Sequence, residues 1–162
     1  MGGFFGVASR SDCVADLFYG TDYHSHLGTR RGGMVVRTRD GFQRNIHDIT
    51  NAPFRTKFEE DLPKHRGNLG LGVISDYEDQ PLLNCSHHGR FAVATVGRID
   101  NLSALTEEVL KNRGVHFSEL KTNEINQTEL VAALINCEDS LVAGIQRVQA
   151  VVDGSCSMLI LT

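Results

Sequence analysis

The order of the apolar segments is the feature of this chain that most constrains its fold. Short apolar runs with β-branched or aromatic residues, typical of buried strands, come early, near the middle and at the very end. Most segments whose apolar residues have the spacing of a helix lie between the last two of these runs. Strands, then helices, then a strand predict an α+β layered fold and not a regular β-α alternation. The expected strands are residues 4–8, 34–37, 70–74, 91–96 and 157–161.

Four segments have apolar residues at the spacing of three and four that one buried helix face requires. The first begins after a cap at Ser11 or Asp12 and stops at Gly28. The second begins after a cap at Asn101 or Ser103 and ends near residues 112–114. The expected helices are residues 13–27, the segment that ends near residues 112–114, residues 126–136 and residues 138–150. The last of them is expected to bury Leu141, Val142, Ile145 and Val148.

Polar stretches separate these elements. Residues 38–68 contain Pro53 and Pro63, and we expect them to be irregular. Two acidic clusters are expected to be solvated loop charge. These clusters are Glu59, Glu60 and Asp61, and then Asp76, Glu78 and Asp79.

The length of 162 residues suits a single domain with a core of its own. The content of 41% hydrophobic and 22% charged residues is ordinary for a globular protein. The last expected strand runs to the final residues without a polar tail. We therefore expect residues 1–162 to form one domain, the N-terminal part of a longer chain.

Charge and hydropathy exclude several classes of partner. The net charge of −4 argues against a general nucleic-acid binder, because phosphate neutralisation requires a basic surplus. No apolar run approaches the roughly 18–20 residues of a membrane span, and the first residues lack the basic start of a signal peptide. We expect a cytoplasmic protein that binds neither nucleic acid nor a membrane.

The cysteines and histidines do not follow a metal-binding or disulfide pattern. His24 and His26 stand two residues apart on an expected helix, where they point to different faces. The cysteines are far apart and include no C-x-x-C pair, which predicts reduced thiols and neither a metal nor a cofactor. They are Cys13, Cys85, Cys137 and Cys156.

Six pieces of the chain resemble, in the same order, segments of one enzyme family. Gly3-Phe-Phe-Gly6 is similar to the start Cys-Gly-Ile-Phe-Gly, and Asn126-Gln-Thr-Glu129 is similar to Ser-Asp-Thr-Glu. The other pieces are residues 27–33, residues 70–72 with 80–81, residues 94–101 and residues 154–161. The family is that of class II glutamine amidotransferases, and the chain most resembles the N-terminal glutaminase domain of amidophosphoribosyltransferases.

The resemblance implies a fold and a chemistry. The fold is the four-layer αββα sandwich of the N-terminal-nucleophile hydrolases. In the family, an N-terminal cysteine attacks the glutamine amide with its own α-amine as the base. An asparagine with a backbone amide stabilises the oxyanion, an arginine binds the substrate carboxylate, and an aspartate binds the substrate amine.

All four of these roles fall on residues that cannot perform them. The nucleophile position is Gly2, and the arginine position is at or near Ser75. The oxyanion asparagine falls on Val96, and the aspartate falls on Gln127. The resemblance therefore implies a pseudoenzyme, a domain without glutamine hydrolysis and without catalytic residues.

Two further groups have open interpretations. Arg30, Arg31, Gly32 and Gly97 match family positions near the substrate, and they are either a residual ligand pocket or, for the arginines, an internal ion pair. Cys85 precedes His87 and His88, a neighbourhood that can lower a thiol pKa. Because spacing alone does not place these side chains together, incidental loop residues are the favoured interpretation.

The resulting hypothesis is a glutaminase-like domain of an amidophosphoribosyltransferase-like protein of purine biosynthesis, with a structural, regulatory or ligand-binding role. Its expected partners are a phosphoribosyltransferase-like domain or subunit, because the chain lacks a phosphoribosyl-binding signature, and further copies of the chain in a homo-oligomer. The alternatives are an active class II amidotransferase that supplies ammonia for phosphoribosylamine synthesis, and an unrelated hydrolase or binding module of the same fold.

Overall fold

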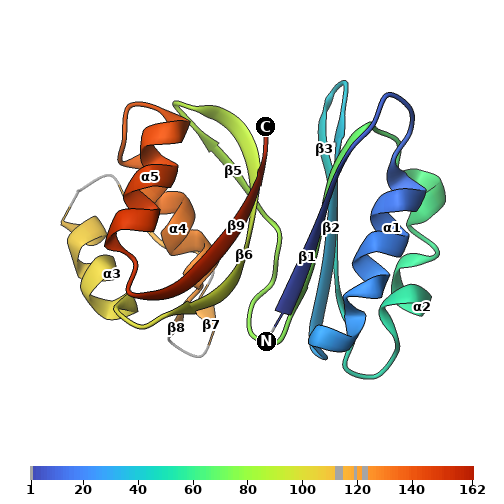
Figure 1. Ribbon diagram of the computed structural model, residues 1–162, viewed down its shortest axis with the longest axis horizontal. Helices are drawn as coiled ribbons and strands as arrows, with labels where there is room; N and C mark the ends of the chain where they lie inside the picture. Colours follow the sequence, from blue (N-terminus) through green and yellow to red (C-terminus); the bar gives the residue numbers. More distant parts are fainter. Residues whose placement is uncertain (1, 112–114, 119, 122–123) are drawn as a thin grey trace.

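The computed structural model describes residues 2–111, 115–118, 120, 121 and 124–162, and within them two larger antiparallel sheets face each other (Figure 1). The first sheet has the order β1 (Gly2–Ala8), β4 (Leu69–Ser75), β2 (Arg31–Thr38), β3 (Gly41–Asp48). The second has the order β5 (Leu82–Ser86), β6 (Gly89–Ile99), β9 (Gly154–Leu161). A short ribbon pairs β7 (Leu120–Lys121) with β8 (Glu124–Ile125).

Helices cover the outer side of each sheet (Figure 1). The first sheet carries α1 (Val14–Tyr23) and α2 (Phe54–Phe58), with 3₁₀ turns at Ser25–Leu27 and Leu62–Lys64. The second sheet carries α3 (Leu102–Leu110), α4 (Gln127–Asn136) and α5 (Leu141–Val151). The side chains of Asn126 and Ser140 cap α4 and α5 by accepting hydrogen bonds from backbone N–H groups of the first turns. No helix in the described part of the chain is long and apolar enough to cross a membrane.

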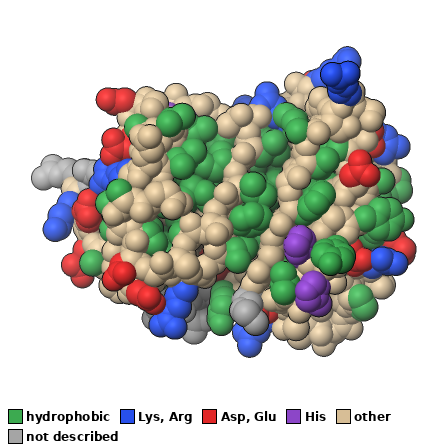
Figure 2. All heavy atoms as spheres, viewed as in Figure 1, with side chains coloured by type: hydrophobic (Ala, Val, Ile, Leu, Met, Phe, Trp, Pro, Cys, Tyr) green, Lys and Arg blue, Asp and Glu red, His purple; other side chains and the backbone are tan. Residues whose placement is uncertain are grey.

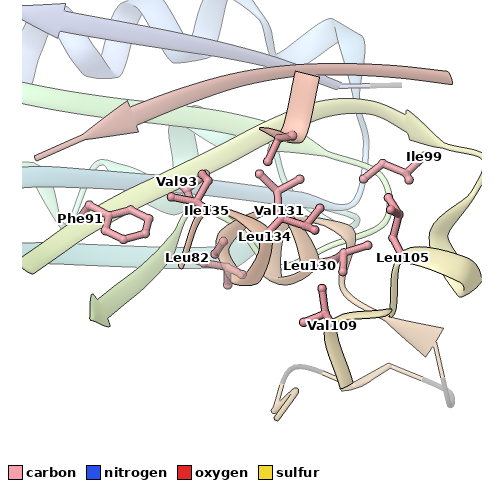
Figure 3. Close-up of a cluster of buried hydrophobic side chains, with 12 residues drawn as sticks. Leu82, Phe91, Val93, Ile99, Leu105, Val109, Leu130, Val131, Leu134 and Ile135 are labelled. Atoms are coloured by element: carbon pink, nitrogen blue, oxygen red, sulfur yellow. The ribbon is translucent and has the colours of Figure 1, made fainter. Parts of the chain in front are cut away.

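Each helical layer has its own hydrophobic core. Under α3, α4 and α5, side chains of α4 fill the space between β6 and α3 (Figure 3). The largest buried side chains of this core include Phe91, Leu105, Leu130, Leu134 and Ile135. Under α1 and α2 the core is more aromatic, because Phe18, Phe54 and Phe58 pack together there.

A third, thinner cluster fills the space between the two sheets. Val35, Leu71 and Val73 contribute from the first sheet, and Ala92 and Ala94 contribute from β6. Since successive strand residues point to opposite faces, β6 directs these alanines to the other sheet and its neighbouring residues to the helices. Both faces of β6 are therefore buried, which explains its unbroken apolar run. Figure 2 shows the complementary pattern on one face of the molecule, where charged side chains lie mainly near the periphery.

The five expected strands are confirmed, and the fold is a mixed α/β fold with antiparallel sheets. The prediction that residues 38–68 are irregular is wrong, because they contain β3 and α2. Strand β3 lies at the sheet edge and has no fully buried residue, so its sequence lacks an apolar alternation. Strand β5 was also not predicted, since its burial alternates over only five residues.

The expected helices form with two corrections. Helix α1 ends at Tyr23, and neither Ser11 nor Asp12 caps it, because the Asp12 carboxylate accepts a hydrogen bond from Gly67 N at 2.9 Å. In α5, Val142 is 64% exposed, while Val148 is buried. The expected end of the second helix at residues 112–114 lies outside the described residues.

Candidate functional site

A pocket of about 750 Å³ lies where the ends of β1 and β4 meet β6, β9 and the start of α4. The resemblance assigns catalytic or substrate-binding roles to four positions, and all of them line this pocket: Gly2, Ser75, Val96 and Gln127. Consecutive positions of this set are 21 to 73 residues apart in the sequence. Gly97 lines the pocket too. The full lining is Gly2, Ile74, Ser75, Tyr77, Glu78, Gln80, Thr95, Val96, Gly97, Arg98, Ile99, Gln127, Ser155 and Cys156.

Strand register brings these positions together. Gly2 is the direct partner of Ser75 in the antiparallel pair of β1 and β4. Across the pocket, Gly97 pairs with Cys156 in the ladder of β6 and β9. Gln127 is the first residue of α4, so its backbone N–H belongs to the helix N-terminus.

Gly2 is held in a position that has no room for a side chain. A Cβ atom at this residue would lie 2.6 Å from the carbonyl oxygen of Ile74, closer than Cβ atoms approach in real structures. Its partner Ser75 is buried, and its hydroxyl oxygen accepts hydrogen bonds from the N–H groups of Tyr77 (3.2 Å) and Glu78 (3.1 Å). Ser75 thus shapes the turn after β4 and does not present a cation to the pocket.

Glu78 occupies the N-terminus of α4. Its carboxylate accepts hydrogen bonds from the backbone N–H groups of Gln127 and Thr128 and from the Thr128 hydroxyl at 2.8 Å. Burial raises the pKa of Glu78 above its ordinary value, although these hydrogen bonds favour the charged form and act in the opposite direction. The prediction of solvated loop charge is wrong for this residue, because the helix N-terminus provides the partners that water was expected to provide.

Two glutamines tie the pocket walls together. The Gln80 side chain donates to Thr95 O at 3.1 Å and accepts from Thr95 N at 2.7 Å, which fixes the loop after β4 to β6. The Gln127 side-chain oxygen accepts from Ile99 N at 2.9 Å. Its amide nitrogen Nε2 has no hydrogen-bond partner among the described residues. The pocket therefore contains an available neutral donor beside the Glu78 carboxylate.

The charge of the pocket is one-sided. Among the described residues that line it, Glu78 carries the only carboxylate and Arg98 the only cationic side chain. Arg98 is 84% exposed and forms an ion pair with Asp100 at 2.9 Å, so it lies at the rim. The interior is consequently acidic.

The pocket thiol is a poor nucleophile. Cys156 is half-buried, and both burial and the charge of Glu78 raise its pKa, which keeps the thiol protonated. Cys85 is exposed on β5 and lies outside the pocket lining. Its neighbours His87 and His88 contact the carbonyl oxygens of Glu138 (2.9 Å) and Ile135 (3.2 Å), at the C-terminal end of α4.

The described residues that line the pocket do not include Arg30, Arg31 or Gly32. Arg31 forms ion pairs with Asp48 and Asp79, the second at 2.6 Å. Gly32 faces the rings of Phe54 and Phe58, whereas Arg30 is exposed. Within the described ranges, no group of three or more His, Cys, Asp or Glu side chains is arranged to hold a metal ion.

Glu78→Gln is expected to change how stability depends on pH. Because burial raises the folded-state pKa of Glu78, the folded protein holds this proton more tightly than the unfolded chain. Its stabilising contribution is complete below the unfolded pKa of about 4.3 and is lost as the pH rises through the folded pKa. The free energy of unfolding of the wild type, minus that of Glu78→Gln, should therefore fall over this range.

Urea unfolding at a series of pH values measures this difference. Glu107→Gln, which removes a carboxyl group from an exposed position of α3, is the matched control for the chemical change itself. If the free energy of unfolding of the wild type, minus that of Glu78→Gln, rises with pH, this result would contradict the raised pKa of Glu78.

Comparisons with known proteins identify the fold. No protein-family model matches the chain, and no curated protein matches it. Among solved structures, it is similar to the glutamine phosphoribosylpyrophosphate (PRPP) amidotransferase from B. subtilis complexed with ADP and GMP. The TM-score is 0.83 at 23% sequence identity, over 100% of this chain and 35% of that one.

A second similar structure is described as the allosteric regulatory enzyme of purine biosynthesis. Its TM-score is also 0.83, at 22% identity, over 99% of this chain and 35% of that one. The chain thus spans about a third of the length of both proteins, and at this identity the likeness establishes a shared fold.

Proposed function

We propose that this chain is a glutaminase-like domain of an amidophosphoribosyltransferase-like protein, and that it binds or regulates without hydrolysing glutamine. One observation carries the proposal: Gly2, Ser75, Val96 and Gln127 all line the same pocket. These positions carry no cysteine thiol at residue 2, no cation at residue 75, no asparagine amide at residue 96 and no carboxylate at residue 127. The pocket has been kept while the groups required for hydrolysis are absent from these positions.

The remaining groups in the pocket do not replace them. Acyl transfer requires an activated nucleophile with a base within hydrogen-bond reach. The thiol of Cys156 has a raised pKa, and the charge of Glu78 contributes to that rise instead of activating the thiol. A protonated thiol beside a negative charge is a weak nucleophile.

The proposal includes the finer architecture and the setting. The two facing sheets with outer helices fit the four-layer αββα sandwich of N-terminal-nucleophile hydrolases. Since the similar enzymes are much longer, we assign the chain to the N-terminal part of a larger assembly. Its partners would be a phosphoribosyltransferase-like domain or subunit in purine biosynthesis and further copies of the chain in a homo-oligomer. The free thiols fit the reducing environment of the cytoplasm.

The purified chain is expected to release no ammonia from glutamine above the blank, as measured with a coupled glutamate dehydrogenase assay. Gly2→Cys is expected to remain at the blank as well, because a Cβ at this position meets the Ile74 oxygen and the other three positions stay changed. Intact mass should establish that Met1 has been removed from this variant, so that the cysteine carries the free α-amine.

Two results would contradict this prediction. One is glutamine-dependent ammonia release by the wild type that disappears in Cys85→Ala, which would assign the nucleophile to the exposed thiol. The other is substantial activity of Gly2→Cys, which would mean that the pocket still holds the remaining catalytic parts. A glutaminase of known activity, added to the same protein sample, controls for inhibition of the assay.

A further inference from the structure

We infer that the pocket binds a small molecule that carries a protonated amine and a neutral carbonyl group but no carboxylate. The inference rests on the proposed function, because it treats the pocket as a binding site without turnover. A volume of about 750 Å³ is within the usual range for small-molecule sites. Ile74, Val96 and Ile99 provide apolar wall, while the polar groups gather around the start of α4.

Glu78 provides the counter-charge for the amine. Its Oε2 atom accepts hydrogen bonds from the N–H and hydroxyl groups of Thr128, whereas Oε1 accepts one from Gln127 N. A carboxylate oxygen has two acceptor sites, so Oε1 can accept a further bond from a ligand. The existing bonds fix the carboxylate before a ligand arrives, which lowers the entropic cost of binding.

The same carboxylate disfavours anionic ligands. An ion inside a partly desolvated pocket interacts more strongly with its neighbours than it does in water. A ligand carboxylate would meet the charge of Glu78, and the guanidinium of Arg98 is exposed at the rim with Asp100 as its partner. Among the described residues that line the pocket, no cationic side chain lies inside it, so an ordinary amino acid would lose hydration around its carboxylate without a cation from these residues in return.

Gln127 supplies the second point of recognition. Its backbone N–H holds Glu78, and its side-chain oxygen is bound to Ile99 N at 2.9 Å. The side-chain oxygen therefore orients the amide, and the Nε2 hydrogens remain as donors for a neutral carbonyl oxygen. An amine and a carbonyl on one short, partly apolar molecule match this pair of groups.

Three probes that share the glutamine side chain but differ in net charge test how the charge of a ligand affects its affinity. Glutaminamide has a charge of about +1 near pH 7, since an α-amine has a pKa of about 7.7–8.0, whereas glutamine is a zwitterion and N-acetylglutamine is an anion. Each is titrated into the isotope-labelled chain, and amide shifts of Gly97, Gln127 and Thr128 report binding in the pocket. We expect glutaminamide to bind roughly tenfold more tightly than glutamine, and N-acetylglutamine to bind most weakly.

Glu78→Gln should reduce the preference for glutaminamide to within about twofold, since the counter-charge is gone. Glu107→Gln changes the net charge equally on the exposed face of α3 and should retain the order. A preference that persists in Glu78→Gln would overturn the inference and leave Glu78 a purely structural cap of α4.

The wild-type series decides the matter even if Glu78→Gln does not fold. Equal affinities, tighter binding of N-acetylglutamine, or no saturable shift with any probe would each overturn the inference. These outcomes leave the proposed function intact, because it concerns hydrolysis. Ammonia release from glutamine would overturn the proposed function, while the comparison of glutaminamide with N-acetylglutamine, neither of which is the free amino acid, would still report the charge preference.

Discussion

Gly33→Ala is expected to lower the free energy of unfolding by roughly 3 kcal/mol or more, because no space exists for the added methyl group. A Cβ on Gly33 would overlap the carbonyl oxygen of Gln80 and lie 2.7 Å from both its carbonyl carbon and Pro81 Cδ. These atoms belong to the chain segment that crosses β2 on its way to β5, so they cannot rotate away as a side chain would. The substitution should also displace Gln80, whose side chain fixes this loop to Thr95 at the pocket.

Urea unfolding followed by far-ultraviolet circular dichroism measures the loss. Gly89→Ala is the matched control, since Gly89 has a φ of +86° but nothing within 4 Å of an added Cβ. That variant should lose only the conformational cost of the left-handed backbone, about 1–2 kcal/mol. Similar losses in the two variants would show that overlap with Gln80 is not the dominant effect.

Leu134→Ala is expected to destabilise the protein by about 2–5 kcal/mol, the range for removing a fully buried leucine side chain. Leu134 has no exposed surface and lies at the centre of the core under α4 (Figure 3). The core cluster that contains Leu134 includes buried side chains of α3, α4 and β6, so we expect the cavity not to collapse easily. Alanine is a better helix former than leucine, and the loss therefore reports packing and not helix propensity.

The control for this variant is Leu110→Ala, which removes the same atoms from a side chain that is 48% exposed at the end of α3. Its loss should stay below about 1 kcal/mol. Equal losses at Leu134 and Leu110 would contradict the central place of Leu134 in the core. Both variants should be compared under the same urea conditions.

Strands could be predicted from the sequence where both of their faces are buried. In β6, Phe91 and Val93 face the helices while Ala92 and Ala94 face the other sheet, so the run is continuous and easily recognised. Strand β3 pairs only with β2 and carries polar side chains at the edge of the sheet. Its conformation depends on the hydrogen bonds of the ladder, which leave no trace in a single sequence.

The pocket could be located only in part. The resemblance pointed to Gly2, Ser75, Val96 and Gln127, and the structure places them around one cavity. It did not point to Glu78, whose partners Gln127 and Thr128 lie 49 and 50 residues further along the chain. An acid in a loop is normally solvated, and nothing near it in the sequence indicates that a helix will begin beside it.

The contact between Gly2 and Ile74 gives the evolution of this site a direction. Every amino acid other than glycine brings a Cβ atom, and at this position that atom would stand 2.6 Å from a backbone oxygen. A change to cysteine, serine or threonine is thus penalised through stability before any catalytic benefit can be selected. The pairing of β1 with β4 thus constrains which residues evolution can place here, because β1 has to move away from β4 before a side chain fits at residue 2.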